Sequence, residues 1–262
     1  MDTLLKINNL SGGYHKERII KDISLEINKG DFLGIIGPNG SGKTTMLRLM
    51  SKVLIPQKGN ITLEGKDIAS MNLKEFAQKV SFVAQDTIIN FPFTVLEIAL
   101  MGRIPHLKRL QPETKKDISI ASKVLMMTDT LYLKEKRIDE ISSGERQRVI
   151  IAKALTQEPV LLFLDEPTSH LDIGHQIQML DLLRRLNSQN NLTIVMVLHD
   201  LNLVSEYCNR IVLLNKGEIF KEGAPLEVLT YQNIEAVYKT VVVVSNNPIN
   251  GKPYIILVSG EK

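Results

Sequence analysis

The stretch Gly37–Thr44 has the residue types and the spacing of a phosphate-binding loop. It reads G-x-x-x-x-G-K-T, it follows the apolar run FLGIIG, and the helical spacing of KTTMLRLMSKVL comes behind it. Glycines let backbone N–H groups turn inward around phosphate oxygens, and the start of a helix adds its positive end. Lys43 can reach the outer phosphates, and the Thr44 hydroxyl can bind Mg²⁺. The stretch therefore predicts a nucleoside triphosphate site. The residues expected to surround the phosphates are Gly37, Pro38, Asn39, Gly40, Ser41, Gly42, Lys43, Thr44 and Thr45.

Two acidic residues at the end of a second apolar run are candidates for metal binding and for activation of water. Asp165 ends VLLFLD and would hold Mg²⁺ through water, and Glu166 follows as the candidate base. An acidic pair that only ends a strand in a turn is the alternative reading. The glycine loop elsewhere in the chain makes that alternative the weaker one.

Three more side chains complete the candidate site. Gln85 ends VSFVAQ and could touch Mg²⁺ and the attacking water, and His199 ends TIVMVLH, near the γ-phosphate. Each alone would be an ordinary polar residue at a strand end, but both strands would close at the carboxyl edge of one sheet, where ligands bind in such folds. Tyr14 follows SGG and could stack on an adenine; a packed or exposed loop tyrosine is an equal alternative.

The elements that must position these residues alternate along the chain between apolar runs and amphipathic helices. This pattern predicts an α/β fold: a P-loop NTPase core with a mainly parallel sheet, an N-terminal antiparallel β subdomain and an inserted α-helical subdomain. We expect one domain with a catalytic core at about 1–85 and 144–240, a helical subdomain at 86–143 and a C-terminal β-hairpin at 241–262. The helix after the glycine loop is expected to bury Met46, Leu49, Met50 and Val53.

Composition sets limits on the kinds of partner. The chain has 262 residues, 44% of them hydrophobic and 23% charged, and its net charge of +3 is too weak to indicate nucleic acid. A single cysteine, Cys208, allows no internal disulfide. The N-terminus has an early acid and does not read as a signal peptide, and no apolar stretch approaches the ~20 residues of a membrane span. Any work at a membrane is therefore expected to go through a partner.

A second helix start, in ISSGERQRVIIAKAL, also has the character of an anion site. Ser142 and Glu145 have the spacing of a capping box, and Val149, Ile150, Ala152 and Leu155 give the helix a buried face. Local structure explains these residues fully. It does not explain why a chain with one phosphate loop needs another exposed Ser-Gly helix start.

The order of GPNGSGKTT, Gln85, ISSGERQR, VLLFLDEPTSHLD and His199 closely resembles the ATP-binding subunits of ABC transporters, over essentially the whole chain. SSGE is similar to the signature motif of that family, and SHLD to its D-loop. The resemblance implies ATP and Mg²⁺ as ligands and two copies packed head to tail. The resemblance further implies that Ser142 and Gly144 donate to the γ-phosphate of the nucleotide held by the other copy and that Asp172 helps to join the two sites. Ser143 and Glu145 are the other candidate nucleotide-binding residues of this turn. Ser143 departs from the family's usual glycine, which crowds the approach of a phosphate slightly and adds a hydroxyl donor.

Two further stretches, FPFTVLEIALMGRIPH and NPINGKPYIIL, resemble importer ATPases for iron–siderophore complexes, haem and cobalamin. The resemblance implies integral-membrane permease subunits, indirectly a substrate-binding protein, and a peripheral place at the cytoplasmic face of the inner membrane. Some importers of molybdate or another oxyanion are similar. Two other classes stay open: a soluble ABC-type ATPase, which generally has coiled-coil arms or two cassettes, and a kinase, which would not need SSGERQR or SHLD. The cargo is not expected to touch this subunit.

Overall fold

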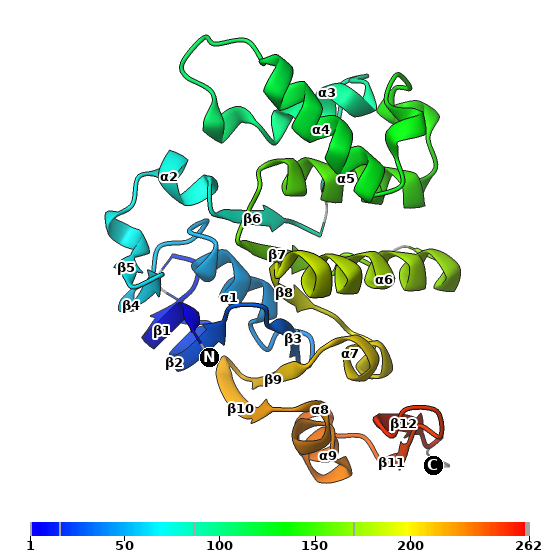
Figure 1. Ribbon diagram of the computed structural model, residues 1–262. Coiled ribbons are helices and arrows are strands. Elements are labelled where there is room, and N and C mark those ends of the chain that lie inside the picture. Colours follow the sequence, from blue (N-terminus) through cyan, green and yellow to red (C-terminus); the bar gives the residue numbers. More distant parts are fainter. Residues whose placement is uncertain (1, 16, 86, 88, 170, 260–262) are drawn as a thin grey trace. The chain divides into compact units, whose positions relative to one another are not determined.

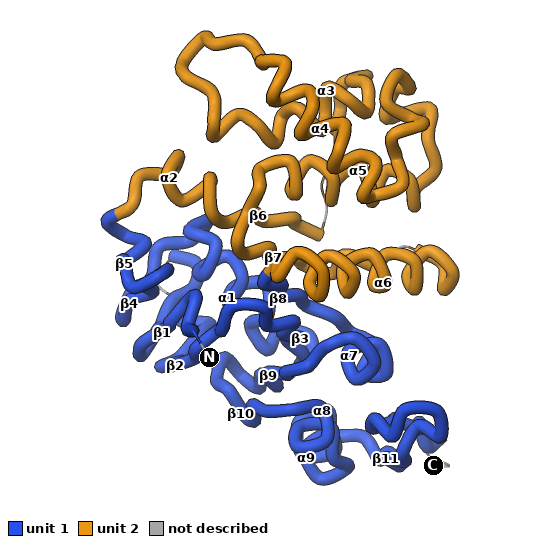
Figure 2. The backbone as a smooth tube through the Cα atoms, viewed as in Figure 1, with its two compact units in different colours: residues 1–70, 193–262 blue, residues 71–192 orange. Residues whose placement is uncertain are grey.

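A computed structural model describes residues 2–15, 17–85, 87, 89–169 and 171–259. The chain divides into two compact units, and each is described by itself (Figure 2). Unit 1 contains 1–70 and 193–262, and unit 2 contains 71–192. The predicted core, helical and hairpin segments divide the chain at other residues, and their bounds remain a prediction.

Unit 1 opens with an antiparallel sheet whose strands are neighbours in the order β2-β1-β4-β5 (Figure 1). Apolar side chains alternate along these strands and turn one face inward, which is the pattern of a sheet with one buried face. The strands are β1 (Thr3–Gly12), β2 (Ile20–Asn28), β4 (Lys58–Leu63) and β5 (Lys66–Asp67).

A second sheet in unit 1 carries the phosphate loop. Its strand β3 (Phe32–Ile36) pairs in parallel with β8 (Thr193–Val197) and with β9 (Arg210–Asn215), while β10 (Glu218–Gly223) returns antiparallel to β9. Every residue of β3 and β8 is buried, as expected for continuous apolar strands with both faces covered. A turn made by Lys216 and Gly217 joins β9 to β10, and both residues have positive φ.

The helices of unit 1 lie between and after the strands of these sheets in chain order. They are α1 (Lys43–Met50), η1 (Ile68–Ser70), α7 (Leu201–Tyr207), α8 (Pro225–Val228) and α9 (Tyr231–Tyr238). Helix α1 ends earlier than predicted, because Lys52 adopts a positive φ and the N–H groups of Val53 and Leu54 both donate to the Arg48 carbonyl. Val53 is therefore 57% exposed, and its predicted place on the buried face is wrong.

The predicted C-terminal hairpin forms from β11 (Val242–Asn246) and β12 (Pro253–Leu257). It is fastened to α7. The Ser205 hydroxyl donates to the Pro253 carbonyl at 2.6 Å, and Asn202 both donates to the Ile255 carbonyl and accepts from its N–H. Within the tail stretch NPINGKPYIIL, the backbone of Pro253 and Ile255 is thus hydrogen-bonded to the helix that follows His199.

Unit 2 contains two parallel strands and most of the helices (Figure 1). The pairing joins β6 to β7, and all five residues of β7 are buried. In chain order the elements are α2 (Leu73–Ala77), β6 (Val80–Val83), α3 (Val95–Met101), η2 (Ile104–His106), α4 (Lys115–Met127), η3 (Leu131–Leu133), η4 (Ile138–Glu140), α5 (Ser143–Thr156), β7 (Leu161–Asp165) and α6 (Ile173–Asn190). Thr94 and Thr114 begin α3 and α4 with capping boxes.

The stretch GRIPH joins three of these helices through a buried arginine. The Arg103 guanidinium donates to Asp117 of α4 at 3.0 Å, to the Thr156 carbonyl at the end of α5 at 2.8 Å and to Glu158 at 2.7 Å. Hydrogen bonds from Thr114, with Arg103 beside it, hold the pKa of Asp117 at about 2. The side chains of Arg103 and Asp117 are 5% and 8% exposed, so this ion pair is sheltered from water.

Among the residues that the structure describes, no helix combines the length and the apolar character needed to cross a membrane.

The buried pair gives a stability prediction. Arg103→Met leaves the Asp117 carboxylate buried without its cation, and we expect the free energy of unfolding to fall by about 3–5 kcal/mol. Arg184→Met is the matched control, because Arg184 pairs with Asp181 where both side chains are about half exposed; it should cost less than ~1 kcal/mol. Urea denaturation at pH 7 measures both. Equal losses in the two variants would contradict the role of burial.

Candidate nucleotide-binding site

The loop between β3 and α1 can only be built with glycine at its first position. Gly37 has φ +150°, and a Cβ there would lie 2.4 Å from the Leu214 carbonyl oxygen and 2.6 Å from the Ser41 hydroxyl oxygen. Any side chain would push the loop away from β9. The close approach of β9 therefore sets the path by which the chain leaves β3 and turns into the loop.

The start of α1 has the features of an anion site. The N-cap residue of the helix is Gly42, with φ +103°, and no side chain caps it. The Lys43 ammonium is folded over the loop and donates to the carbonyls of Gly37 and Pro38 at 2.9 and 3.0 Å. The Ser41 hydroxyl is buried, and among the described residues it has no hydrogen-bond partner. An uncapped helix start with a lysine and an orphaned hydroxyl fits the phosphate oxygens of a nucleotide.

Residues outside the predicted loop support it. The Arg48 guanidinium donates to the Tyr14 hydroxyl at 2.7 Å and lies 5.9 Å from the centre of its ring, so Tyr14 is tied to α1. Burial raises the pKa of Tyr238 to about 12, while a hydrogen bond from the Gly37 N–H acts in the opposite direction. Sequence reasoning missed Tyr238, because a tyrosine near the end of a tail helix gives no local signal of contact with a loop 200 positions earlier.

In unit 2 the predicted base and the predicted glutamine are in contact. The Gln85 amide donates to the Glu166 carboxylate at 2.7 Å. Glu166 has a positive φ of 51° directly after β7, which is a strained backbone for this residue and is typical of functional sites. Asp165, the last residue of β7, is 2% exposed. Mg²⁺ accepts carboxylate and amide oxygens as ligands, and here these are the buried Asp165 and the exposed Gln85.

His199 lies two residues beyond β8 in unit 1, and it is exposed. The next residue, Asp200, begins α7 by accepting hydrogen bonds from the N–H groups of Asn202 and Leu203. Asn202 and Ser205 of the same helix are hydrogen-bonded to the C-terminal hairpin. His199 thus lies two residues before a helix that is fastened to that hairpin.

The predicted capping box at the start of α5 is present. The Ser142 hydroxyl and N–H both donate to one Glu145 carboxylate oxygen, at 2.7 and 2.8 Å, and the Glu145 N–H donates back to the hydroxyl. The other carboxylate oxygen accepts from the Tyr132 hydroxyl at 2.7 Å. The bonds from Tyr132 and Ser142 lower the pKa of Glu145 to about 2. Ser142 and Ser143 are exposed, whereas Gly144 is buried.

The predicted D-loop residue is in contact with the same region. Asp172 begins α6: one of its carboxylate oxygens accepts the His175 N–H at 2.9 Å, and the other accepts the ring Nδ1–H at 2.8 Å. These bonds from His175 lower the pKa of Asp172. The His175 ring in turn lies against Gly144. His170, within SHLD, lies outside the described residues.

The predicted site residues are divided between the two units. Unit 1 holds Tyr14, the loop residues 37–45 and His199. Unit 2 holds Gln85, Ser142, Ser143, Gly144, Glu145, Asp165, Glu166 and Asp172. Within unit 2 the structure brings Gln85 to Glu166, and Asp172 through His175 to Gly144. The roles given to these residues remain predictions.

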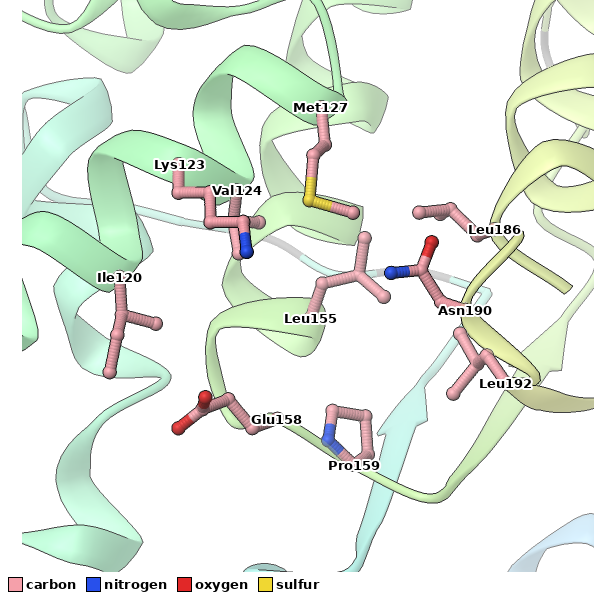
Figure 3. Close-up of a pocket in the computed structure, with 10 residues that line it drawn as sticks. All are labelled: Ile120, Lys123, Val124, Met127, Leu155, Glu158, Pro159, Leu186, Asn190 and Leu192. Carbon is pink, nitrogen blue, oxygen red and sulfur yellow. The ribbon is translucent and has the colours of Figure 1, made fainter.

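A cavity of about 250 Å³ in unit 2 does not belong to this chemistry (Figure 3). Its lining is largely apolar, and Leu155 of α5 projects into the space between Met127 of α4 and Leu186 of α6. None of the predicted site residues lines it. It is a packing gap where the end of α5 meets the other two helices.

Comparison with known proteins identifies the family. The ABC transporter family model matches residues 20–169. The ferric enterobactin transport ATP-binding protein FepC of Escherichia coli is 36% identical over 96% of this chain and 93% of its own length. YvrA, an uncharacterized ABC transporter ATP-binding protein of Bacillus subtilis, is 41% identical, and the match spans 97% of this chain and 58% of YvrA.

Solved structures agree. An ABC transporter described as metal-chelate type, in an inward-facing conformation, matches with a TM-score of 0.87 and 30% identity over 99% of this chain and 98% of that one. The dimeric structure of the bacterial ABC transporter cassette MJ0796 matches with a TM-score of 0.73 and 28% identity over 84% of this chain and 98% of the cassette. The chain belongs to the ABC transporter family, whose ATP-binding subunits are ATPases. The predicted family and fold class are confirmed, and membership implies ATP binding and association in pairs.

The contact between Tyr132 and Glu145 gives a prediction that depends on pH. Because the pKa of folded Glu145 lies near 2, below its ordinary value of 4.5, the ionised carboxylate stabilises the fold at neutral pH and loses that effect as the pH falls toward 2. Tyr132→Phe should raise this pKa and lower the free energy of unfolding at pH 7 by about 0.5–1 kcal/mol. The deficit should shrink at pH 3.

Urea denaturation at the two pH values and NMR titration of glutamate carboxyl carbons measure these effects. Tyr231→Phe, at another exposed tyrosine, is the control and should change neither quantity. A Glu145 pKa that stays near 2 in Tyr132→Phe would contradict the assignment.

Proposed function

We propose that this chain is the ATP-hydrolysing subunit of an importer for metal chelates such as iron–siderophore complexes, haem or cobalamin. The observation that carries the ATPase part is the loop of unit 1. Its helix start is uncapped, the Lys43 ammonium folds over it, and the Ser41 hydroxyl has no hydrogen-bond partner within the described part of the chain. These groups are suited to bind phosphate, and the chain that contains them belongs to a family of ATP-binding proteins.

The reaction proposed is in-line attack of water on the γ-phosphate. Glu166 acts as the base, and the Gln85 amide, already bonded to its carboxylate, helps to orient the water. Lys43, His199 and Ser142 stabilise the charge that develops on the phosphate oxygens. The Lys43 ammonium would exchange the carbonyls of Gly37 and Pro38 for phosphate oxygens, which are the stronger acceptors. Tyr14 would stack on the adenine.

Mg²⁺ bound with the nucleotide would neutralise phosphate charge. The chain offers hard oxygen ligands for it: the Thr44 hydroxyl in unit 1, and Gln85 and the buried carboxylate of Asp165 in unit 2. Among the described residues no group of three or more His, Cys, Asp or Glu side chains could hold a metal by itself. This agrees with a metal that arrives with ATP and is bound largely by phosphate.

Two copies would act together. In the proposed arrangement the signature turn of one copy, from Ser142 to Glu145, contacts ATP held by the loop of the other, and Asp172 helps to join the two sites. The exposure of Ser142 and Ser143 supports this proposal, as does the dimeric cassette to which the chain is similar. The pair would dock on membrane permease subunits at the cytoplasmic face, supplied by a substrate-binding protein.

The role of Glu166 gives a direct test. Glu166→Gln removes the base but keeps the size of the side chain and its place beside Gln85. Turnover should therefore fall by about 10²–10⁴, while the Kd for ATP stays within about twofold. Phosphate release and binding of a fluorescent ATP analogue measure the two effects. Glu113→Gln, at an exposed residue of the same unit, is the control. Full activity in Glu166→Gln would exclude Glu166 as the base.

The transport function is tested by reconstitution with the neighbouring permease and binding protein in liposomes. ATP-dependent uptake of a ferric siderophore, haemin or cobalamin, absent with Glu166→Gln, is the expected result. Uptake of molybdate instead would show that the cargo is an oxyanion and not a metal chelate. Failure to associate with any membrane protein, or phosphoryl transfer from ATP to an added acceptor, would overturn the importer proposal.

A further inference from the structure

Gly144, the second residue of α5, faces the ring of a histidine in the same chain. A Cβ built on Gly144 would lie 2.5 Å from His175 Cδ2 and 3.0 Å from both Cγ and Nε2. A Cβ atom does not approach a non-bonded heavy atom to 2.5 Å, so an alanine at 144 requires the ring or the start of α5 to move. The space that a side chain would need is therefore filled from within the chain, by α6.

The His175 ring cannot move aside without losing a hydrogen bond. His175 is held by both carboxylate oxygens of Asp172, one on its backbone N–H at 2.9 Å and one on Nδ1–H at 2.8 Å. The same carboxylate begins α6, so swinging the ring away from Gly144 breaks a charge-assisted hydrogen bond at a helix start. Gly144, His175 and Asp172 thus form a chain of contacts from the first turn of α5 to the first turn of α6.

We propose that His175 is a positioning residue that joins Asp172 to Gly144, so that the starts of α5 and α6 meet a second copy of the chain as one rigid surface. The inference rests on the proposed function, in which the signature turn and Asp172 both act across the interface between two copies. It gives glycine at 144 a cause within the chain: the histidine ring occupies the place of a side chain. Ser143, by contrast, is exposed, which agrees with a side chain at that position where the family usually has glycine.

The alternative cause of glycine at 144 is the approach of a phosphate from the second copy. The two causes predict opposite results when the ring is removed. If the ring excludes a side chain, His175→Ala makes room for the methyl group of Gly144→Ala. If the phosphate excludes it, His175→Ala gives no relief.

The experiment is a double-mutant cycle on turnover and on ATP-driven self-association, the latter measured by analytical ultracentrifugation in the Glu166→Gln background. Gly144→Ala should lower both on the order of tenfold or more, and His175→Ala by several-fold through lost alignment. The double variant should be no worse than His175→Ala within about twofold. The Kd for a fluorescent ATP analogue should change less than about twofold in all of them, since the phosphate loop is untouched.

The control is Gly174→Ala beside His175, where a Cβ would have only an ordinary 3.5 Å contact with Asp172 Oδ1. It should leave turnover and self-association unchanged. If Gly144→Ala cannot be purified folded but the double variant can, the relief is shown in its strongest form. Losses that multiply in the double variant would overturn the role of His175.

Failure of the proposed function gives a different result. Ser142→Arg should abolish turnover and self-association while ATP still binds. If ATP binding is lost as well, Ser142 acts on the nucleotide of its own chain, and if nothing is lost, the signature turn has no part in the reaction; either result removes the two-copy proposal. If Ser142→Arg behaves as expected and only the cycle is additive, the two-copy proposal stands and the inference about His175 is wrong.

Discussion

The close approach of β9 to the start of the phosphate loop is the constraint on which unit 1 depends. The Leu214 carbonyl oxygen leaves no room for a side chain at Gly37, and the loop that follows ends in a helix without a cap. An uncapped start leaves the positive end of α1 for a ligand. The parallel pairing of β3 with β9 sets this geometry. Tyr238 of α9 then contacts the loop at Gly37, and Arg48 of α1 holds Tyr14.

Helix starts in this chain differ in a way that follows their use. Thr94 caps α3 with a capping box, and Thr114 caps α4 in the same way, where the capping-box carboxylate of Asp117 also pairs with Arg103. Asp172 caps α6 and also holds a histidine ring, and Ser142 caps α5 while its hydroxyl stays exposed. A capping side chain satisfies the free N–H groups at the start of its helix. Any further role of that side chain depends on which other groups it can reach.

Prediction from sequence succeeded where the physical cause lies within a few residues. The glycine loop and the capping box of Ser142 depend on spacing and backbone preference, and both are present in the structure. The predicted end of α1 was wrong because Lys52 adopts a left-handed backbone conformation that no local sequence pattern indicates. Val53 is exposed as a result.

Contacts between residues that are distant in the sequence could not be predicted from local sequence patterns. The buried Arg103 reads in the sequence like any surface arginine, because its partners are 14, 53 and 55 positions away. The ring of His175 against Gly144 is a case of the same kind. Which helix starts would be exposed, and what would face them, follows only from how the helices of unit 2 pack.

The capping box of α5 bears on how one serine can serve both structure and reaction. The Ser142 N–H and hydroxyl share a single Glu145 oxygen, and the Tyr132 hydroxyl occupies the other. A hydroxyl has one proton to donate, so a Ser142 hydroxyl that turned to a phosphate would leave Glu145, while the N–H bond would keep the helix start intact. The Tyr132 bond draws charge from Glu145 and so weakens its competition for that proton. A helix start capped twice by the same glutamate can therefore lend one of its two bonds to a ligand without unwinding.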